Sequence, residues 1–207
     1  MTSCLSNVLM SHTALKVKHD VACELREMID CVRDAEATHV LPHMVTVLLD
    51  ILRNGEPSFK KDSTEYQFRR VLVEIIHRVP YNDSMKPHTN SIMSVMLHML
   101  RNDGEENSVT CLKTIIDIVR TLKNVADEHV TEFLAIFRTL LKNFRSLVEE
   151  YLSDGSVVVD EKMVLPSSKS FKVMAESPVD IVLFFQSYKA IMQPTIQEML
   201  PEVVDVC

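Results

Sequence analysis

The chain has 207 residues, of which 46% are hydrophobic and 25% are charged, and its formal net charge is −7. This length and composition allow a sizeable core and argue against a disordered chain, which would be poorer in apolar residues. The acidic balance argues against binding of nucleic acid or an anionic membrane through the overall field, although a local basic patch is compatible with it.

The cysteines and the N-terminal sequence indicate a reduced, intracellular protein. No basic region followed by a long apolar run opens the chain, and no stretch of about 18 apolar residues follows, so neither a signal peptide nor a transmembrane helix is expected. The cysteines form no closely spaced pair and are expected to be small core residues. They are Cys4, Cys23, Cys31, Cys111 and Cys207.

Apolar residues three or four positions apart predict amphipathic helices from residue 15 onward. The second helix, residues 39–54, has Pro42 in its first turn, where a missing N–H costs nothing, and Gly55 as its C-terminal stop. A third helix has a cap at Asp62 or Ser63 and stops at Pro80. The stripe of the first helix is Val17, Val21, Leu25, Met28, Ile29 and Val32. That of the third is Phe68, Leu72, Ile75, Ile76 and Val79.

The following segment repeats the plan of the second helix. In residues 81–104, Pro87-His88 corresponds to Pro42-His43, and Gly104 corresponds to Gly55. Two further helices are expected over residues 105–124 and 127–152. The first carries the stripe Val109, Leu112, Ile115, Ile116 and Val119. The second carries Phe133, Phe137, Leu140, Leu141, Phe144, Val148 and Leu152.

The C-terminal part begins with a change of composition. Residues 153–170 lose the helical period and contain glycine, proline and serines, which predicts an exposed loop. Val157–Val159 could form a short extended stretch there. A helix follows, restarted at Ser177-Pro178, and residues 200–207 open another helix that stops within its apolar stripe at Cys207. A solenoid end normally presents a polar cap, so we expect an N-terminal piece of something longer, or a truncated copy.

The three glycines mark a repeat. Gly55, Gly104 and Gly155 are 49 and 51 residues apart, and each ends a leucine-rich run. A helix pair of this length is typical of HEAT or armadillo solenoids, in which neighbouring pairs bury each other's apolar faces. We predict an all-α, HEAT-like α-solenoid of about four antiparallel helix pairs. Three lie within residues 1–152, and a further pair, apparently truncated, occupies 171–207. A helical bundle with accidental spacing is the alternative.

Few residues indicate chemistry. The glycines are too sparse for a phosphate-binding loop, and no GxSxG or HExxH motif is present. His39 and His43 have a metal-ligand spacing, but Pro42 lies between them and no acidic or cysteine partner is near. Cys23 and Cys31 would make an incomplete zinc site. We therefore expect no catalytic, cofactor-binding or metal residues, no cofactor and no small-molecule substrate; the sequence does not identify the protein-binding residues.

Three further groups of side chains are site candidates. Four histidines are scattered over the predicted helices, and each is expected to be a satisfied surface or groove residue: His77, His88, His98 and His129. The densest basic patch either meets an acidic partner or a phosphate or, as we favour, consists of solvated positions beside a helix start: Lys60, Lys61, Arg69 and Arg70. Three methionines share one helix, where core packing is favoured over a partner surface: Met93, Met96 and Met99.

Four segments carry a resemblance to a known family. They are "RRVLVEIIHRVP" (Arg69–Pro80), "KPHT" (Lys86–Thr89), "GEENSVTCL" (Gly104–Leu112) and "SFKVMAESPVDIVLFFQSYK" (Ser170–Lys189). They resemble the N-terminal HEAT region of the transformation/transcription domain-associated protein family, very large pseudokinase scaffolds of histone acetyltransferase complexes. The resemblance covers roughly residues 20–207, and its motifs are structural rather than catalytic.

The resemblance implies a non-enzymatic scaffold segment of a nuclear transcription coactivator, which recruits acetyltransferase complexes to DNA-bound activators. Its partners would be transcription activators and acetyltransferase-complex subunits, with no direct binding of nucleic acid or membrane. No binding residue of the family matches a motif here, so none is assigned, and the loop at 153–170 is shorter than the family implies. A HEAT-repeat adaptor of another class, for transport or phosphatase assembly, is the alternative; an enzyme with an unrecognised site is a remote third.

Overall fold

The structure is a computed structural model of the chain. It describes residues 7–11, 14–29, 40–122, 126–154, 168–176 and 178–188, together with Gln193 and Gln197. Helices make up the regular structure of this part, which contains no β-strand. None of its helices is long and apolar enough to cross a membrane.

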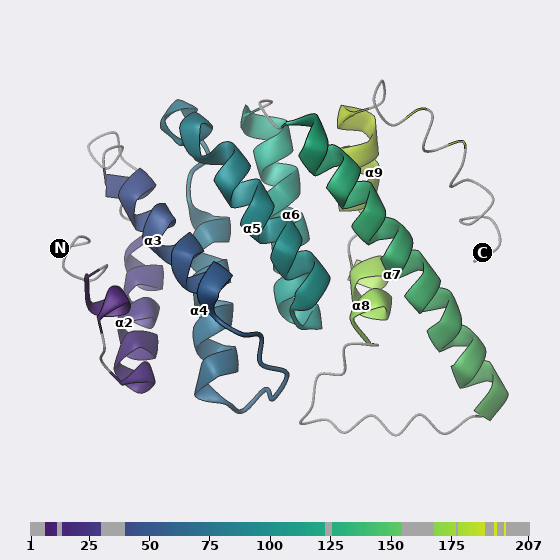
Figure 1. Ribbon diagram of the computed structural model, residues 1–207, viewed down its shortest axis with the longest axis horizontal. Coiled ribbons are helices and arrows are strands. Elements are labelled where there is room, and N and C mark those ends of the chain that lie inside the picture. The colour runs from purple at the N-terminus through teal and green to yellow at the C-terminus, as the bar shows by residue number, and fades with distance from the viewer. Residues whose placement is uncertain are drawn as a thin grey trace.

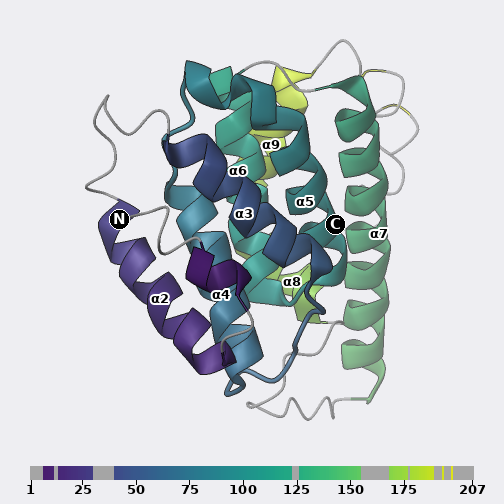
Figure 2. The same ribbon diagram turned by 60° about the vertical axis from the view of Figure 1, so that its left-hand side comes forward.

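The described helices stack in two layers (Figures 1 and 2). In chain order they are α2 (Leu15–Met28), α3 (Val40–Asn54), α4 (Thr64–Arg78), the 3-10 helix η3 (Asp83–His88), α5 (Thr89–Asn102), α6 (Glu105–Leu122), α7 (Asp127–Asp154), α8 (Ser168–Glu176) and α9 (Pro178–Ser187). One layer holds α2, α4 and α6, followed by α8 and α9, and the other holds α3, α5 and α7. The predicted all-α solenoid is confirmed, whereas the number of pairs stays a prediction.

Several helix ends follow the sequence signals. Ser63 is the N-cap of α4, since its Oγ accepts a hydrogen bond from the Tyr66 amide at 3.1 Å, so the serine rather than Asp62 caps this helix. The same helix ends at Arg78, before Pro80. Farther along, α8 ends at Glu176 and α9 begins at Pro178, where a restart was predicted.

The glycines at the helix ends have different structural roles from those predicted. Gly55 donates its N–H to the Ile51 carbonyl at 3.0 Å, but its φ lies outside the left-handed region. A Cβ there would lie 3.0 Å from the Ile51 oxygen and 3.3 Å from Arg69 Nη1, so close approach is what requires glycine. Gly104 lies at the N-cap position of α6, because its carbonyl accepts from the Ser108 amide at 3.0 Å. Gly155 lies outside the described residues.

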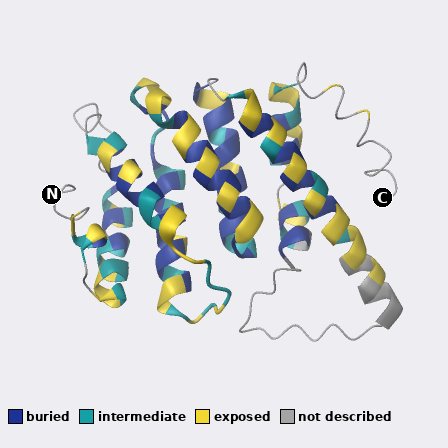
Figure 3. Cartoon of the chain, viewed as in Figure 1, coloured by how far each residue is buried: buried dark blue, intermediate teal, exposed yellow. Residues whose placement is uncertain are grey.

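The core runs between and within the layers, and Figure 3 shows the buried positions along the packed sides of the helices. The predicted stripes of α4 and α6 are buried throughout. Met93, Met96 and Met99 are all 0% exposed, which confirms the core reading of this methionine row. Val17 is 46% exposed, so the first predicted stripe is wrong at that position. Leu25 and Ile29 of the same stripe are buried as predicted, and Ala22, which was not predicted, is buried with them.

The C-terminal helices pack on α7 through aromatic rings. The ring of Phe184 on α9 stacks on Phe133, with centroids 3.8 Å apart, and Phe185 meets Phe137 edge-on at 5.4 Å. The predicted loop at 153–170 overlaps the end of α7 and the start of α8. Its remainder, including Val157–Val159, lies outside the described residues. So does the helix predicted at 200–207.

Candidate protein-binding face

A buried ion pair joins three helix ends. Arg69 on α4 donates from Nε to Asp103 Oδ2, and the two side chains are 7% and 0% exposed. Arg69 Nη1 also donates to the carbonyls of Leu52 and Gly55, each at 2.9 Å. The guanidinium thus ties α4 to the end of α3 and to the turn between α5 and α6. Because removing two charges from water is costly, such a pair needs these additional hydrogen bonds.

The second oxygen of Asp103 holds the start of α6. Its Oδ1 accepts from the Gly104 amide at 3.1 Å and from Asn107 Nδ2 at 2.9 Å. Ser108 Oγ donates to the Asp103 carbonyl at 3.3 Å. The carboxylate therefore has a donor at each oxygen, and its negative charge sits where unpaired N–H groups of a helix begin.

The basic patch was predicted either to meet an acidic partner or a phosphate or to be solvated. Neither interpretation holds for Arg69, because this residue is buried. Lys61 and Arg70 do lie nearer the surface, and each forms ion pairs with α6: Lys61 Nζ lies 3.7 Å from Glu105 and Arg70 Nη1 lies 3.2 Å from Glu106. Lys60 is exposed. The four cations therefore do not form one patch.

A buried lysine fastens α8 to the end of α5. Lys169 is 7% exposed, and its Nζ donates to the Arg101 carbonyl at 2.6 Å. Burial lowers the pKa of this ammonium from the ordinary 10.5 to about 8, although the nearby Asp103 carboxylate acts in the opposite direction. The amine thus satisfies a carbonyl that the last turn of α5 leaves without an intrahelical partner.

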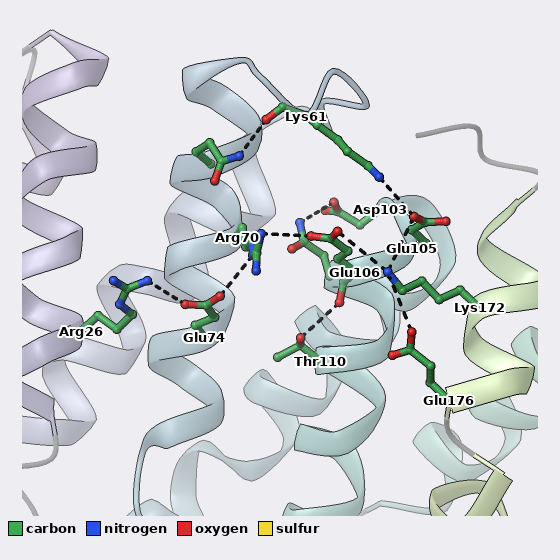
Figure 4. A network of polar contacts seen from close by, with 12 residues as sticks. Arg26, Lys61, Arg70, Glu74, Asp103, Glu105, Glu106, Thr110, Lys172 and Glu176 are labelled. Atoms are coloured by element: carbon green, nitrogen blue, oxygen red, sulfur yellow. Dashed lines mark hydrogen bonds and ion pairs between the residues drawn. The ribbon is translucent and has the colours of Figure 1, made fainter. Parts of the chain in front are cut away.

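A row of alternating charges crosses four helices of one layer (Figure 4). We call it the charge ladder; in order it comprises Arg26 on α2, Glu74 and Arg70 on α4, Glu106 on α6, and Lys172 and Glu176 on α8. The closest contact, 3.0 Å, joins Arg26 Nη1 to Glu74 Oε2, and the longest, 3.9 Å, joins Lys172 Nζ to Glu176 Oε1. Its side chains are between 25% and 49% exposed.

Exposed ion pairs of this kind stabilise a fold by only about 0.2–1 kcal/mol each. The charge ladder is therefore better understood as a continuous charged surface over consecutive helices than as a large source of stability. A polar groove of about 290 Å³ lies along it, with Val109, Thr110 and the exposed Lys113 of α6 among its walls. Such a surface offers hydrogen-bonding and charged groups to a protein partner.

The residues that the structure describes contain no group of three or more His, Cys, Asp or Glu side chains suited to a metal. His43 is exposed on α3, whereas His39 and Cys31 lie outside the described residues. Burial raises the pKa of the buried Cys111 thiol and of the half-buried Cys23 thiol, whose Sγ lies 3.7 Å from His19 Nε2. Neither environment favours a reactive thiolate.

The histidines differ from one another. Nδ1 of His77 lies 3.2 Å from Thr114 Oγ1 and 3.7 Å from Asp117 Oδ2, and burial lowers its pKa against the opposing pull of this carboxylate. His98 is exposed and contacts Asn102 on its own helix. His129 is buried, and Nε2 finds no hydrogen-bond partner among the described residues, so the prediction of a satisfied histidine is wrong there.

The sequence analysis did not identify the acidic residues of the charge ladder or Asp103. Arg70–Glu74 and Lys172–Glu176 stand four residues apart on a helix, a spacing that favours ion pairs and was available as a signal. Asp103 carried a weaker signal, as an acidic residue two positions before the start of a helix. No local pattern indicated the contact of Lys169 with α5.

Comparison with known proteins identifies relatives over most of the chain. The human "Transformation/transcription domain-associated protein" is 26% identical over 195 residues, which cover 80% of this chain. The Schizosaccharomyces pombe "SAGA complex/NuA4 acetyltransferase complex subunit Tra1" is 26% identical over 215 residues, or 91% of the chain. The Dictyostelium discoideum "Probable transcription-associated protein 1" is 29% identical over 130 residues, or 63%.

No family model matches the chain. The chain spans about 5% of the human protein and 6% of the S. pombe protein. The matches nevertheless extend across both layers of the solenoid and confirm the resemblance. The chain is similar to members of the transformation/transcription domain-associated protein family, and the similarity covers a short segment of these relatives' length.

Proposed function

We propose that this chain is a non-enzymatic scaffold segment that binds protein partners during the assembly of transcription-regulating acetyltransferase complexes in the nucleus. The relatives whose names identify them as subunits of SAGA and NuA4 complexes support this proposal. The carrying observation is that this similarity covers 91% of the chain and coincides with a solenoid. Arrays of stacked helices expose extended surfaces suited to protein segments.

The mechanism that we propose is recruitment. A scaffold that holds an activator and an acetyltransferase subunit together raises the effective concentration of one near the other without any chemistry of its own. The charge ladder and its groove supply a polar surface over α2, α4, α6 and α8 for one of these contacts. Acetyl transfer would be the work of other subunits.

Cross-linking mass spectrometry in nuclear extract tests the partner class. The tagged chain should cross-link to acetyltransferase-complex subunits or to transcription activators more than a helical control protein of similar charge does. Cross-links to transport or phosphatase subunits in their place would favour the alternative adaptor class. Absence of specific cross-links would contradict a scaffold role for this segment.

A further inference from the structure

Two helix ends of the chain share a sequence but differ in exposure. The first, which we call the first corner, is residues 51–56, Ile-Leu-Arg-Asn-Gly-Glu, at the end of α3. The second corner is residues 99–105, Met-Leu-Arg-Asn-Asp-Gly-Glu, between α5 and α6. Gly55 and Glu56 are exposed at the first corner, whereas Asp103 and Gly104 are buried at the second.

The second corner is covered by α8. Lys169 donates to the Arg101 carbonyl at 2.6 Å, and Lys172 Nζ lies 3.7 Å from Glu105 Oε1. Val173 of the same helix is 0% exposed. A short helix with lysines beside an apolar residue is thus what covers this acidic corner within the chain itself.

A cavity adjoins the first corner. Its volume is about 250 Å³, and its apolar walls come from Leu15 of α2, Ile51 and Leu52 of α3, and Phe68 and Leu72 of α4. A closed apolar cavity of about 150 Å³ holds benzene, so this one accommodates one bulky aliphatic or aromatic side chain.

The charges around this cavity favour a basic occupant. Arg69 lines it, but its guanidinium is engaged by Asp103 and by two carbonyls. Glu56 and Glu65 also line it, are exposed, and form no ion pair with any described residue. Lys16, Arg53 and Arg70, the cations adjacent in sequence to the cavity walls, do not line it. The charge left for a partner is therefore negative.

We propose that the first corner docks a basic amphipathic helix of a partner protein, which places an apolar side chain in the cavity and lysine or arginine beside Glu56 and Glu65. This proposal deepens the proposed function and rests on it. An acidic partner segment would bring like charges to the two glutamates, so this corner discriminates between partners by charge.

Fluorescence anisotropy with the complete 207-residue chain tests the charge part. The probe is a labelled amphipathic peptide with leucines on one face and lysines flanking them, and its matched control has glutamates in place of the lysines. We expect the lysine peptide to bind about tenfold more tightly at low salt. Glu56→Gln with Glu65→Gln should weaken its binding about fivefold. The exposed control pair Glu24→Gln with Glu128→Gln should leave it unchanged.

Changing the peptide rather than the protein tests the apolar part, so folding of the protein is not in question. Replacing the central leucine by alanine should weaken binding about tenfold, because a buried anchor contributes most of the affinity of such a contact. Equal binding of both charge versions, or no effect of the two glutamate substitutions, would overturn the proposal. The proposal would also be overturned if the natural chain formed a homodimer and the two glutamate substitutions made it monomeric. A second copy of the chain would then occupy the first corner. Failure here with successful cross-linking to complex subunits would reject only this corner.

Discussion

Arg69 and Asp103 are separated by 34 residues in the chain and meet in its interior, where neither side chain retains more than 7% exposure. The contact joins α4 to the turn between α5 and α6. Through the carbonyls of Leu52 and Gly55, the same guanidinium also contacts the end of α3. One arginine thus connects α3, α4 and the α5–α6 turn.

Removing the cation should expose the cost of burying Asp103. We expect Arg69→Met to lower the free energy of unfolding by about 3–5 kcal/mol, because the carboxylate then stays buried without its ion partner. Urea denaturation measures the change. The double variant Arg69→Met with Asp103→Asn should recover part of the loss. The control Arg70→Met breaks only exposed pairs and should cost no more than about 1 kcal/mol.

Replacing Gly55 by alanine should lower the stability of the protein, although the same replacement stabilises proteins at unconstrained glycines. Alanine at a compatible glycine position stabilises a protein by about 0.4–1 kcal/mol through the unfolded state. At Gly55 the new Cβ would lie 3.0 Å from the Ile51 carbonyl and 3.3 Å from Arg69 Nη1. We therefore expect Gly55→Ala to destabilise by about 1–3 kcal/mol. An increase in thermal stability would show that the close approach is unimportant; the neighbouring Asn54→Ala is the control.

Lys169 should make stability depend on pH in the alkaline range. Its folded-state pKa of about 8 is below the ordinary 10.5, so the unfolded chain binds more protons between these values. The stability of the natural chain should therefore rise with pH across this window relative to Lys169→Met, by up to roughly 3 kcal/mol. Below pH 8 the difference between the two proteins should be flat. A difference that stays constant up to pH 10.5 would contradict the burial of this amine.

The cap of α4 offers a smaller, local test. Ser63 Oγ accepts from the Tyr66 amide, which otherwise has no intrahelical acceptor. Ser63→Ala should lower the free energy of unfolding by about 1 kcal/mol. The exposed Ser91→Ala on α5 serves as the matched control and should change stability by less than half of that. Equal effects in chemical denaturation would show that the capping bond is not the cause.

Local patterns in the sequence were sufficient for the helices but not for their polar contacts. The stripe from Phe68 to Val79 predicted a buried face because helical period is a property of neighbouring residues. The pairing of Arg69 with Asp103 depends on how two helices meet, which no local pattern contains. For the same reason Arg69 was grouped with the surface cations beside it. The repeat marked by the three glycines stays a prediction, and the constraint at Gly55 is close approach to the Ile51 carbonyl and Arg69 rather than a left-handed turn.

The exposure of the first helix illustrates the same limit. Val17 fits the spacing of a buried stripe, yet it is 46% exposed, because the partners available to α2 in the stack lie on the side of Ala22 and Leu25. Only the pairs of the charge ladder that lie within one helix could be predicted from the sequence. Spacing along one helix could indicate Arg70–Glu74, whereas Arg26–Glu74 joins residues 48 positions apart.

We propose that this solenoid binds acetyltransferase-complex subunits through its surface, and quantitative capture from nuclear extract tests this proposal most directly. The tagged chain should retain these subunits, and reversal of two charges of the ladder, Arg70→Glu with Lys172→Glu, should reduce capture at least about fivefold while circular dichroism confirms unchanged helicity. Capture no greater than that of a helical control protein, for the natural chain, would contradict the account.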